Sequence, residues 1–195
     1  MAISKGRNDL QTNIQNTATM LNSFAIDINS FYEKKIENIE NNIREIITKN
    51  SNEDFEITQS MTNLLKQEID LCKDFQKEGF EMLLTKVYSF VEIYLEELLS
   101  RLSYSRNKAI NEYKQDGQPM HEVSDIEKYF YILKKHQKTS LEKISDVWTD
   151  FHNFHRMRKN ITHHKKAIEH ITIEYINSNI SKITQLLSML ELETR

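Results

Sequence analysis

The sequence predicts an all-α protein, an up-and-down helical bundle preceded by a long N-terminal helix. Helix breakers are scarce, since the 195 residues include 3 Gly and 1 Pro. Apolar residues recur at spacings of three and four over long tracts, which is the period of an amphipathic helix. Short polar clusters separate these tracts and mark the expected turns.

Composition narrows the classes of function. One cysteine, Cys72, excludes an intramolecular disulfide framework and fits a reducing compartment. A formal net charge of −3 argues against nucleic acid covering the whole surface, so any RNA contact must be local. No apolar run reaches the roughly 20 residues that span a bilayer, and the N-terminus lacks a signal-peptide core. We therefore expect a soluble, cytoplasmic protein without a membrane partner.

The first tract, from about Asn8 to Lys49, predicts one helix some 60 Å long at 1.5 Å per residue. Such a helix must either fold back on a second long helix or pair with another subunit. Residues 49–54 are polar and predict its end. We assign residues 1–54 to a bundle or dimerisation appendage and 55–195 to the main bundle. The apolar positions are Leu10, Ile14, Leu21, Phe24, Ile28, Phe31, Ile36, Ile39, Ile43 and Ile46, with a slip after Phe31 that breaks the heptad register.

The second tract, from about Ile57 to Lys114, contains the strongest core helix. Gly79 is a candidate point for a kink or a division. The sequence 116–119, Asp-Gly-Gln-Pro, predicts its end. The apolar stripe comprises Leu83, Val87, Phe90, Val91, Tyr94, Leu95, Leu98 and Leu102, with Glu96, Glu97 and Arg101 expected to face outward.

Three further helices are expected after it. A capping box at 124–127 opens a helix that runs to about His136, and another at 139–142 opens a helix toward Arg158. The last tract runs from about Lys165 to Leu192. Its β-branched residues at 171–173 leave a strand as an alternative, although no second strand is evident for pairing.

The chemistry-bearing stretch is 150–170, DFHNFHRMRKNITHHKKAIEH, which holds five of the seven histidines. Arg158 precedes His163 by five positions, and an arginine with a histidine is the minimum needed to cleave a phosphodiester without a metal. In a continuous helix the two would lie about 140° apart. Either the helix ends between them, at Asn160 and Thr162, or each residue meets its counterpart across a two-fold axis.

This arrangement resembles the HEPN superfamily, whose signature is an arginine followed, after four to six residues, by a histidine. The similarity rests on a core helix reading YSFVEIYLEELL, then shorter helices, then RKNITH ahead of a final long helix, and it covers roughly residues 57–192. Arg158 matches the motif arginine and His163 the motif histidine, with His164 as the alternative. Glu92 resembles the acidic residue of the HEPN core helix.

The resemblance implies an α-helical domain that commonly dimerises and cleaves RNA without a metal or cofactor, in toxin–antitoxin, phage-defence or CRISPR systems. The histidine would move a proton between the RNA 2′-hydroxyl and the leaving oxygen, and Arg158 would stabilise the charged transition state. The product would carry a 2′,3′-cyclic phosphate. Flanking phosphates of the RNA, for example a tRNA, would meet Lys159, Lys165 and Lys166. An antitoxin or effector protein is the implied partner.

Other interpretations remain open. The chain could be a non-catalytic helical interaction or RNA-binding module that dimerises and binds a partner protein, with 150–170 a basic loop that complements a helix end. It could also be an antitoxin-like inhibitor of a separate enzyme. His152 and His155 share a helix face near Asp150, but no complete set of metal ligands is visible.

Overall fold

A computed structural model describes residues 5–49, 55–120, 123–136, 149, 156 and 171–193. Within these ranges every element of regular structure is a helix, which confirms an all-α bundle with a long N-terminal helix. The elements are α1 (Lys5–Lys49), α2 (Phe55–Arg101), α3 (Arg106–Gln115), α4 (Asp125–His136) and α6 (Ile173–Glu193).

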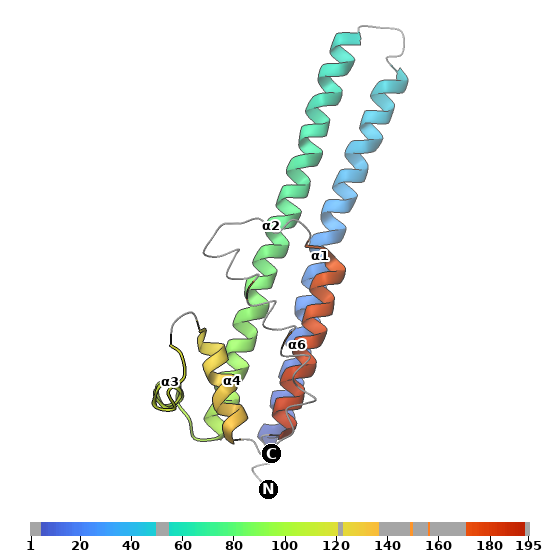
Figure 1. Cartoon of the computed structure of the whole chain (residues 1–195). Helices are drawn as coiled ribbons and strands as arrows, with labels where there is room; N and C mark the ends of the chain where they lie inside the picture. The colour runs from blue at the N-terminus through green and yellow to red at the C-terminus, as the bar shows by residue number, and fades with distance from the viewer. Residues whose placement is uncertain are drawn as a thin grey trace.

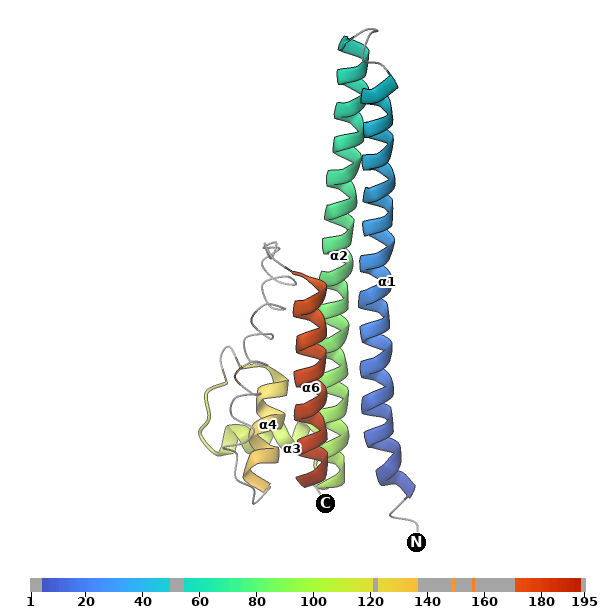
Figure 2. The same ribbon diagram turned by 90° about the vertical axis from the view of Figure 1, so that its right-hand side faces the viewer.

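The molecule is built on a long antiparallel hairpin of α1 and α2 (Figure 1). Helix α6 runs beside the half of the hairpin that holds the start of α1, and it contacts both α1 and α2 (Figure 2). Helices α3 and α4 pack on each other near the C-terminal end of α2. The other half of the hairpin extends beyond these helices. The long N-terminal helix thus folds back on a second long helix, the first of the two arrangements expected.

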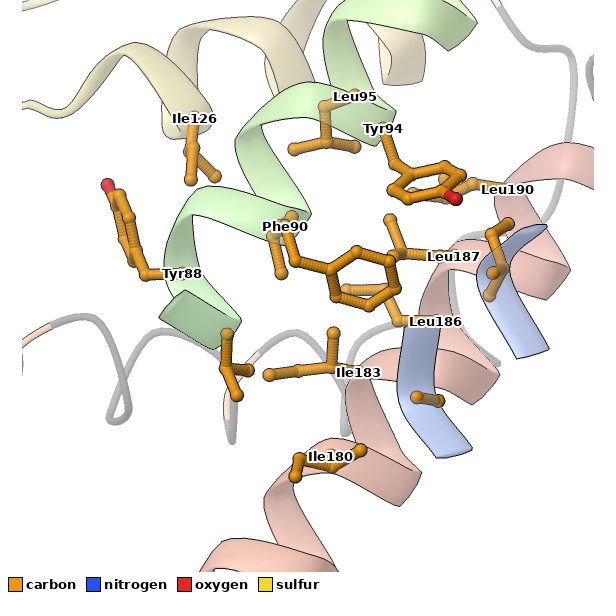
Figure 3. Packing of buried hydrophobic residues seen from close by; sticks show 14 of the residues in the cluster. Tyr88, Phe90, Tyr94, Leu95, Ile126, Ile180, Ile183, Leu186, Leu187 and Leu190 are labelled. Carbon is orange, nitrogen blue, oxygen red and sulfur yellow. The ribbon is translucent and has the colours of Figure 1, made fainter. Parts of the chain in front are cut away.

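The hydrophobic core lies in the half of the hairpin that α4 and α6 cover. Apolar side chains from the first half of α1, the C-terminal half of α2, α4 and α6 form one cluster (Figure 3). Within it Phe90 and Tyr94 make an edge-to-face contact at 4.7 Å between ring centroids. The outer half has a much smaller cluster of buried residues, Ile39, Ile69 and Cys72. Stabilisation by burial is therefore concentrated at one end of the hairpin.

The second tract is divided at 102–105 rather than at Gly79. Helix α2 continues through Gly79, where an added Cβ would lie 3.2 Å from Cγ2 of Ile28 on α1. The glycine therefore permits close approach of the two helices. The break is made by Ser103, which has a φ of 60°, and by Ser105, whose hydroxyl caps α3 by accepting from the Lys108 N–H.

The remaining boundaries follow local capping chemistry. The capping box at 124–127 is confirmed, because the Ser124 N–H donates to Glu127 and the Glu127 N–H donates to the Ser124 hydroxyl. Gly117, with a φ of 72°, follows the end of α3 as predicted. The residues from Ile173 onward form a helix rather than a strand. The hydroxyl of Thr172, the residue before this helix, accepts a hydrogen bond from the Tyr175 N–H. The predicted helix from 139 to Arg158 lies outside the described residues, apart from two exposed helical positions, 149 and 156.

Two residues of the apolar pattern of the first helix are exposed. Leu21 and Ile14 are buried as expected, but Phe24 is 51% exposed and Phe31 is 62% exposed. Each directly precedes a residue that faces inward, Ala25 or Tyr32, so each lies about 100° from the inward face. In the described part of the chain, no helix has the length and apolar character needed to cross a membrane.

Candidate functional site

The residues that carry the predicted RNA chemistry lie outside the described part of the chain. They are Arg158, Lys159, Asn160, Thr162, His163, His164, Lys165 and Lys166. Arg156, two positions before the motif arginine, is helical and exposed. Glu92 is described, and it lies half-buried on α2 beside the buried residue Val91. The accessory or RNA-binding role of Glu92 stays a prediction.

The described residues form a different concentration of polar chemistry between α3 and α4, here named the α3–α4 polar cluster. At its centre the Tyr104 hydroxyl donates to Glu112 Oε2 at 2.6 Å and lies 2.6 Å from His136 Nε2. His136 Nε2 is in turn 3.1 Å from Glu112 Oε1. Three titratable side chains therefore lie in mutual contact. The cluster comprises Tyr104, Glu112, Asp116, Tyr131, Lys135 and His136.

A lysine joins the two carboxylates of the cluster. Lys135 Nζ lies 2.9 Å from Glu112 Oε1 and 2.6 Å from Asp116 Oδ2. Asp116 also accepts from the Tyr131 hydroxyl at 3.1 Å. Glu112 lies in the last turn of α3 and Asp116 caps its C-terminus, so the two carboxylates are about one helical turn apart and can share the ammonium. These hydrogen bonds and ion pairs hold α3 against α4.

The contacts determine which groups are charged. The hydrogen bond from Tyr104, followed by that from Lys135, lowers the pKa of the Glu112 carboxyl from 4.5 to about 2. The same carboxylate raises the pKa of the Tyr104 phenol, and the hydrogen bonds to Asp116 and Glu112 raise the pKa of Lys135. At neutral pH the cluster therefore holds carboxylates, an ammonium and a protonated phenol. Tyr104 is a hydrogen-bond donor here and a poor base.

We expect this cluster to make stability depend on pH. A carboxyl whose folded-state pKa is lowered stabilises the fold above its unfolded pKa, and that contribution is lost as pH falls from about 4.5 toward 2. Glu112→Gln should lower the free energy of unfolding by about 1 to 2 kcal/mol at pH 7, the range of a hydrogen bond to a charged group with some exposure. Chemical denaturation from pH 7 to pH 2.5 measures the difference. The difference in free energy of unfolding between wild type and Glu112→Gln should become smaller at low pH. A difference that stays constant with pH would contradict the lowered pKa of Glu112.

Two further networks connect α2 to its neighbours. The Tyr129 hydroxyl donates to Glu96 Oε1 at 2.8 Å, and Glu191 on α6 is fully buried with Arg101 Nη1 at 3.5 Å. Glu96 and Arg101 therefore do not face outward as expected, whereas Glu97 is 53% exposed. Polar residues on the outer edge of the predicted stripe anchor α4 and α6. Their partners are far away in sequence, so periodicity alone could not reveal the contacts.

Sequence reasoning also missed the α3–α4 polar cluster. A local signal was present, since Glu112 and Asp116 are four residues apart and Lys135 and His136 end a short helix. The signal did not identify partners, because the two pairs lie on different helices. Among the described residues, no group of three or more His, Cys, Asp or Glu side chains could hold a metal ion.

The cluster can hold groups in place more readily than it can transfer protons. Its carboxylates are occupied by donors, while Lys135 and His136 remain 40% and 34% exposed. His136 ends α4, the last described helix before 150–170 in sequence. Comparisons with known proteins add no assignment, because this chain matches no family model, no curated protein and no solved structure.

Proposed function

We propose that this protein is a metal-independent endoribonuclease of the HEPN kind, acting as a homodimer in the manner of toxin or phage-defence effectors. The observation that carries the proposal is the motif RKNITH at 158–163, in a stretch with five of the seven histidines. The order of elements is consistent with it. A buried core helix α2 is followed by short helices α3 and α4, and the long helix α6 follows the motif and packs on α2.

The proposed reaction is an internal transesterification. His163 removes the proton from a ribose 2′-hydroxyl, whose oxygen then attacks the adjacent phosphorus. The P–O5′ bond breaks, the leaving 5′-oxygen takes the proton that His163 removed from the 2′-hydroxyl, and the new 3′ end of the RNA carries a 2′,3′-cyclic phosphate. Arg158 stabilises the additional negative charge through forked hydrogen bonds. Lys159, Lys165 and Lys166 hold flanking phosphates, so binding weakens as salt rises.

The deciding experiment compares RNA with DNA of the same sequence. We expect the purified chain to cleave tRNA and single-stranded RNA in EDTA, to leave DNA intact, and to yield 2′,3′-cyclic phosphate ends detectable by mass spectrometry. DNA lacks the internal nucleophile, so it is the matched negative substrate. Cleavage that stops in EDTA, or that also occurs on DNA, would contradict the mechanism. Absence of both cleavage and RNA binding would remove the RNA proposal altogether.

A second candidate is a non-catalytic helical module that binds a partner protein. The observation that favours it is the outer half of the α1–α2 hairpin, which has a small buried cluster and many exposed apolar side chains. A pull-down with the full chain and with a variant altered on that surface separates the two functions. Loss of partner binding with RNA cleavage intact would assign the hairpin to assembly alone.

A further inference from the structure

Helix α2 carries a second apolar stripe that faces away from α1. Six large side chains define it, and each is between 44% and 67% exposed. They recur with the alternating spacing of four and three that marks a coiled-coil seam, interrupted by Glu68 and Glu78. The stripe is about 37 Å long at 1.5 Å per residue. Its apolar members are Ile57, Met61, Leu64, Leu71, Phe75 and Met82.

The register explains why α1 does not cover this stripe. Leu64 directly precedes Leu65, and Leu71 directly precedes Cys72, both of which belong to the contact with α1. One residue step turns the helix by about 100°, so the stripe looks sideways out of the hairpin. Phe24 and Phe31 of α1 have the same offset from their own inward positions, as described above.

Both helices contribute to the same side of the hairpin. A groove of about 390 Å³ lies on it near the outer end, with Asn42 and Glu45 of α1 opposite Met61 and Leu64 of α2. Closer to the core, α6 does not cover this side of the hairpin, since the Met82 side chain is 67% exposed. The open face therefore extends from Ile57 to Met82, a little more than half of the length of α2.

The face is large enough for a stable interface. At these exposed fractions the six side chains present roughly 600 Å² of surface, and Phe24 with Phe31 raises this to about 800 Å². Monomeric proteins rarely expose apolar patches above about 600 Å², whereas each partner in a standard interface buries about 800 Å².

We propose that a second copy of this chain covers this face, with α2 antiparallel to α2 of the partner about a two-fold axis level with residues 68–71. In this register each position of the stripe meets one whose number adds to 139. Ile57 then meets Met82, Met61 meets Glu78, Leu64 meets Phe75, and Glu68 meets Leu71. The two hairpins together form a four-helix bundle. This inference does not depend on RNA cleavage.

Charge favours the antiparallel orientation. In a parallel pair Glu68 would face Glu68 and Glu78 would face Glu78, which places like charges together. In the antiparallel pair each carboxylate lies opposite an apolar side chain instead. Glu68 already has a counter-ion in its own chain, since Lys35 Nζ lies 3.5 Å from its Oε1.

The test is sedimentation equilibrium of the full chain at micromolar concentrations. The wild type should sediment at twice the chain mass of 23.2 kDa. Leu71→Glu brings a carboxylate against Glu68 of the second copy and should raise the dissociation constant by about 100-fold or more. Leu71→Lys supplies a counter-charge and should dimerise better than Leu71→Glu. The matched control is Ile26→Glu, which alters a residue that is 53% exposed and follows rather than precedes the inward Ala25. It should remain dimeric.

Cross-linking tests the orientation separately. In a Cys72→Ala background, a mixture of Leu64→Cys and Phe75→Cys chains should form a disulfide between the two variants, and neither variant should do so alone. A Leu64→Cys chain that links to itself would show parallel pairing and overturn the register. A monomeric wild type would overturn the proposal and would leave another polypeptide as the partner for this face. A Leu71→Glu chain that stays dimeric would also overturn it. Circular dichroism confirms that each variant is folded.

Discussion

Replacing Arg158 or His163 by alanine is expected to lower the rate of RNA cleavage by at least about 100-fold, because a general acid–base group and a charge-stabilising donor each contribute that much or more. Loss of His163 removes the group that moves the proton. Loss of Arg158 removes the forked contact to the transition state, and Arg158→Lys should restore only part of the rate, because lysine offers a point charge. Single-turnover cleavage of a labelled RNA measures each effect.

Neighbouring histidines provide the controls. His164→Ala decides between the two candidate motif histidines, since the larger loss identifies the one that acts. His170→Ala removes the same type of side chain from the same stretch and should leave the rate within about twofold. Equal losses in His163→Ala and His170→Ala would indicate a general electrostatic role for the basic stretch. Full activity in both Arg158→Ala and His163→Ala would falsify the assigned site.

Replacing Tyr129 by alanine should destabilise the fold by about 3 to 5 kcal/mol, the usual cost of removing a large buried aromatic side chain. Tyr129 has no exposed surface, and its hydroxyl donates to Glu96 on α2. Burial, followed by the hydrogen bond to Glu96, raises the pKa of this phenol, so it remains a donor well into the alkaline range. The substitution therefore removes both the packing and the polar contact between α4 and α2.

Tyr129→Phe separates these two contributions. It retains the ring but leaves the Glu96 carboxylate without this donor, so the expected loss is about 1 to 2 kcal/mol. Ile93→Ala, at a position that is 64% exposed on the same α2, should change stability by no more than about 0.5 kcal/mol. Urea unfolding at one fixed protein concentration gives all three values, since self-association would otherwise shift the midpoint. If Tyr129→Phe costs as much as Tyr129→Ala, the hydrogen bond rather than packing dominates.

The helix boundaries that could be predicted are those set by residues next to the boundary in sequence. The polar residues after Lys49, the capping box at 124–127 and the glycine after α3 act over a few residues, and all three mark real ends. Gly79 carried the same breaker signal, yet α2 continues through it. Its meaning depends on Ile28, which is 51 positions away and approaches the helix from α1.

The candidate sites divide in a similar way. The Arg158 and His163 motif is visible in the sequence because its members are close in the chain, and its function stays a proposal. The α3–α4 polar cluster was not predicted, because Glu112 and His136 meet only when α3 packs on α4. Glu96 and Arg101 show the same limit, since charged residues at the edge of an apolar stripe find buried partners on other helices.

By itself, the sequence determined that the chain is helical, where most helices end, and which stretch holds the histidines. Tertiary structure decided which apolar residues are covered: Leu21 and Phe24 belong to one periodic pattern, yet one is 4% exposed and the other 51%. The physical reason is range. Periodicity and capping act through hydrogen bonds and contacts within about one helical turn. Burial depends instead on which face of a helix meets another element, and that face is selected only when the hairpin closes and α6 packs against one side of it.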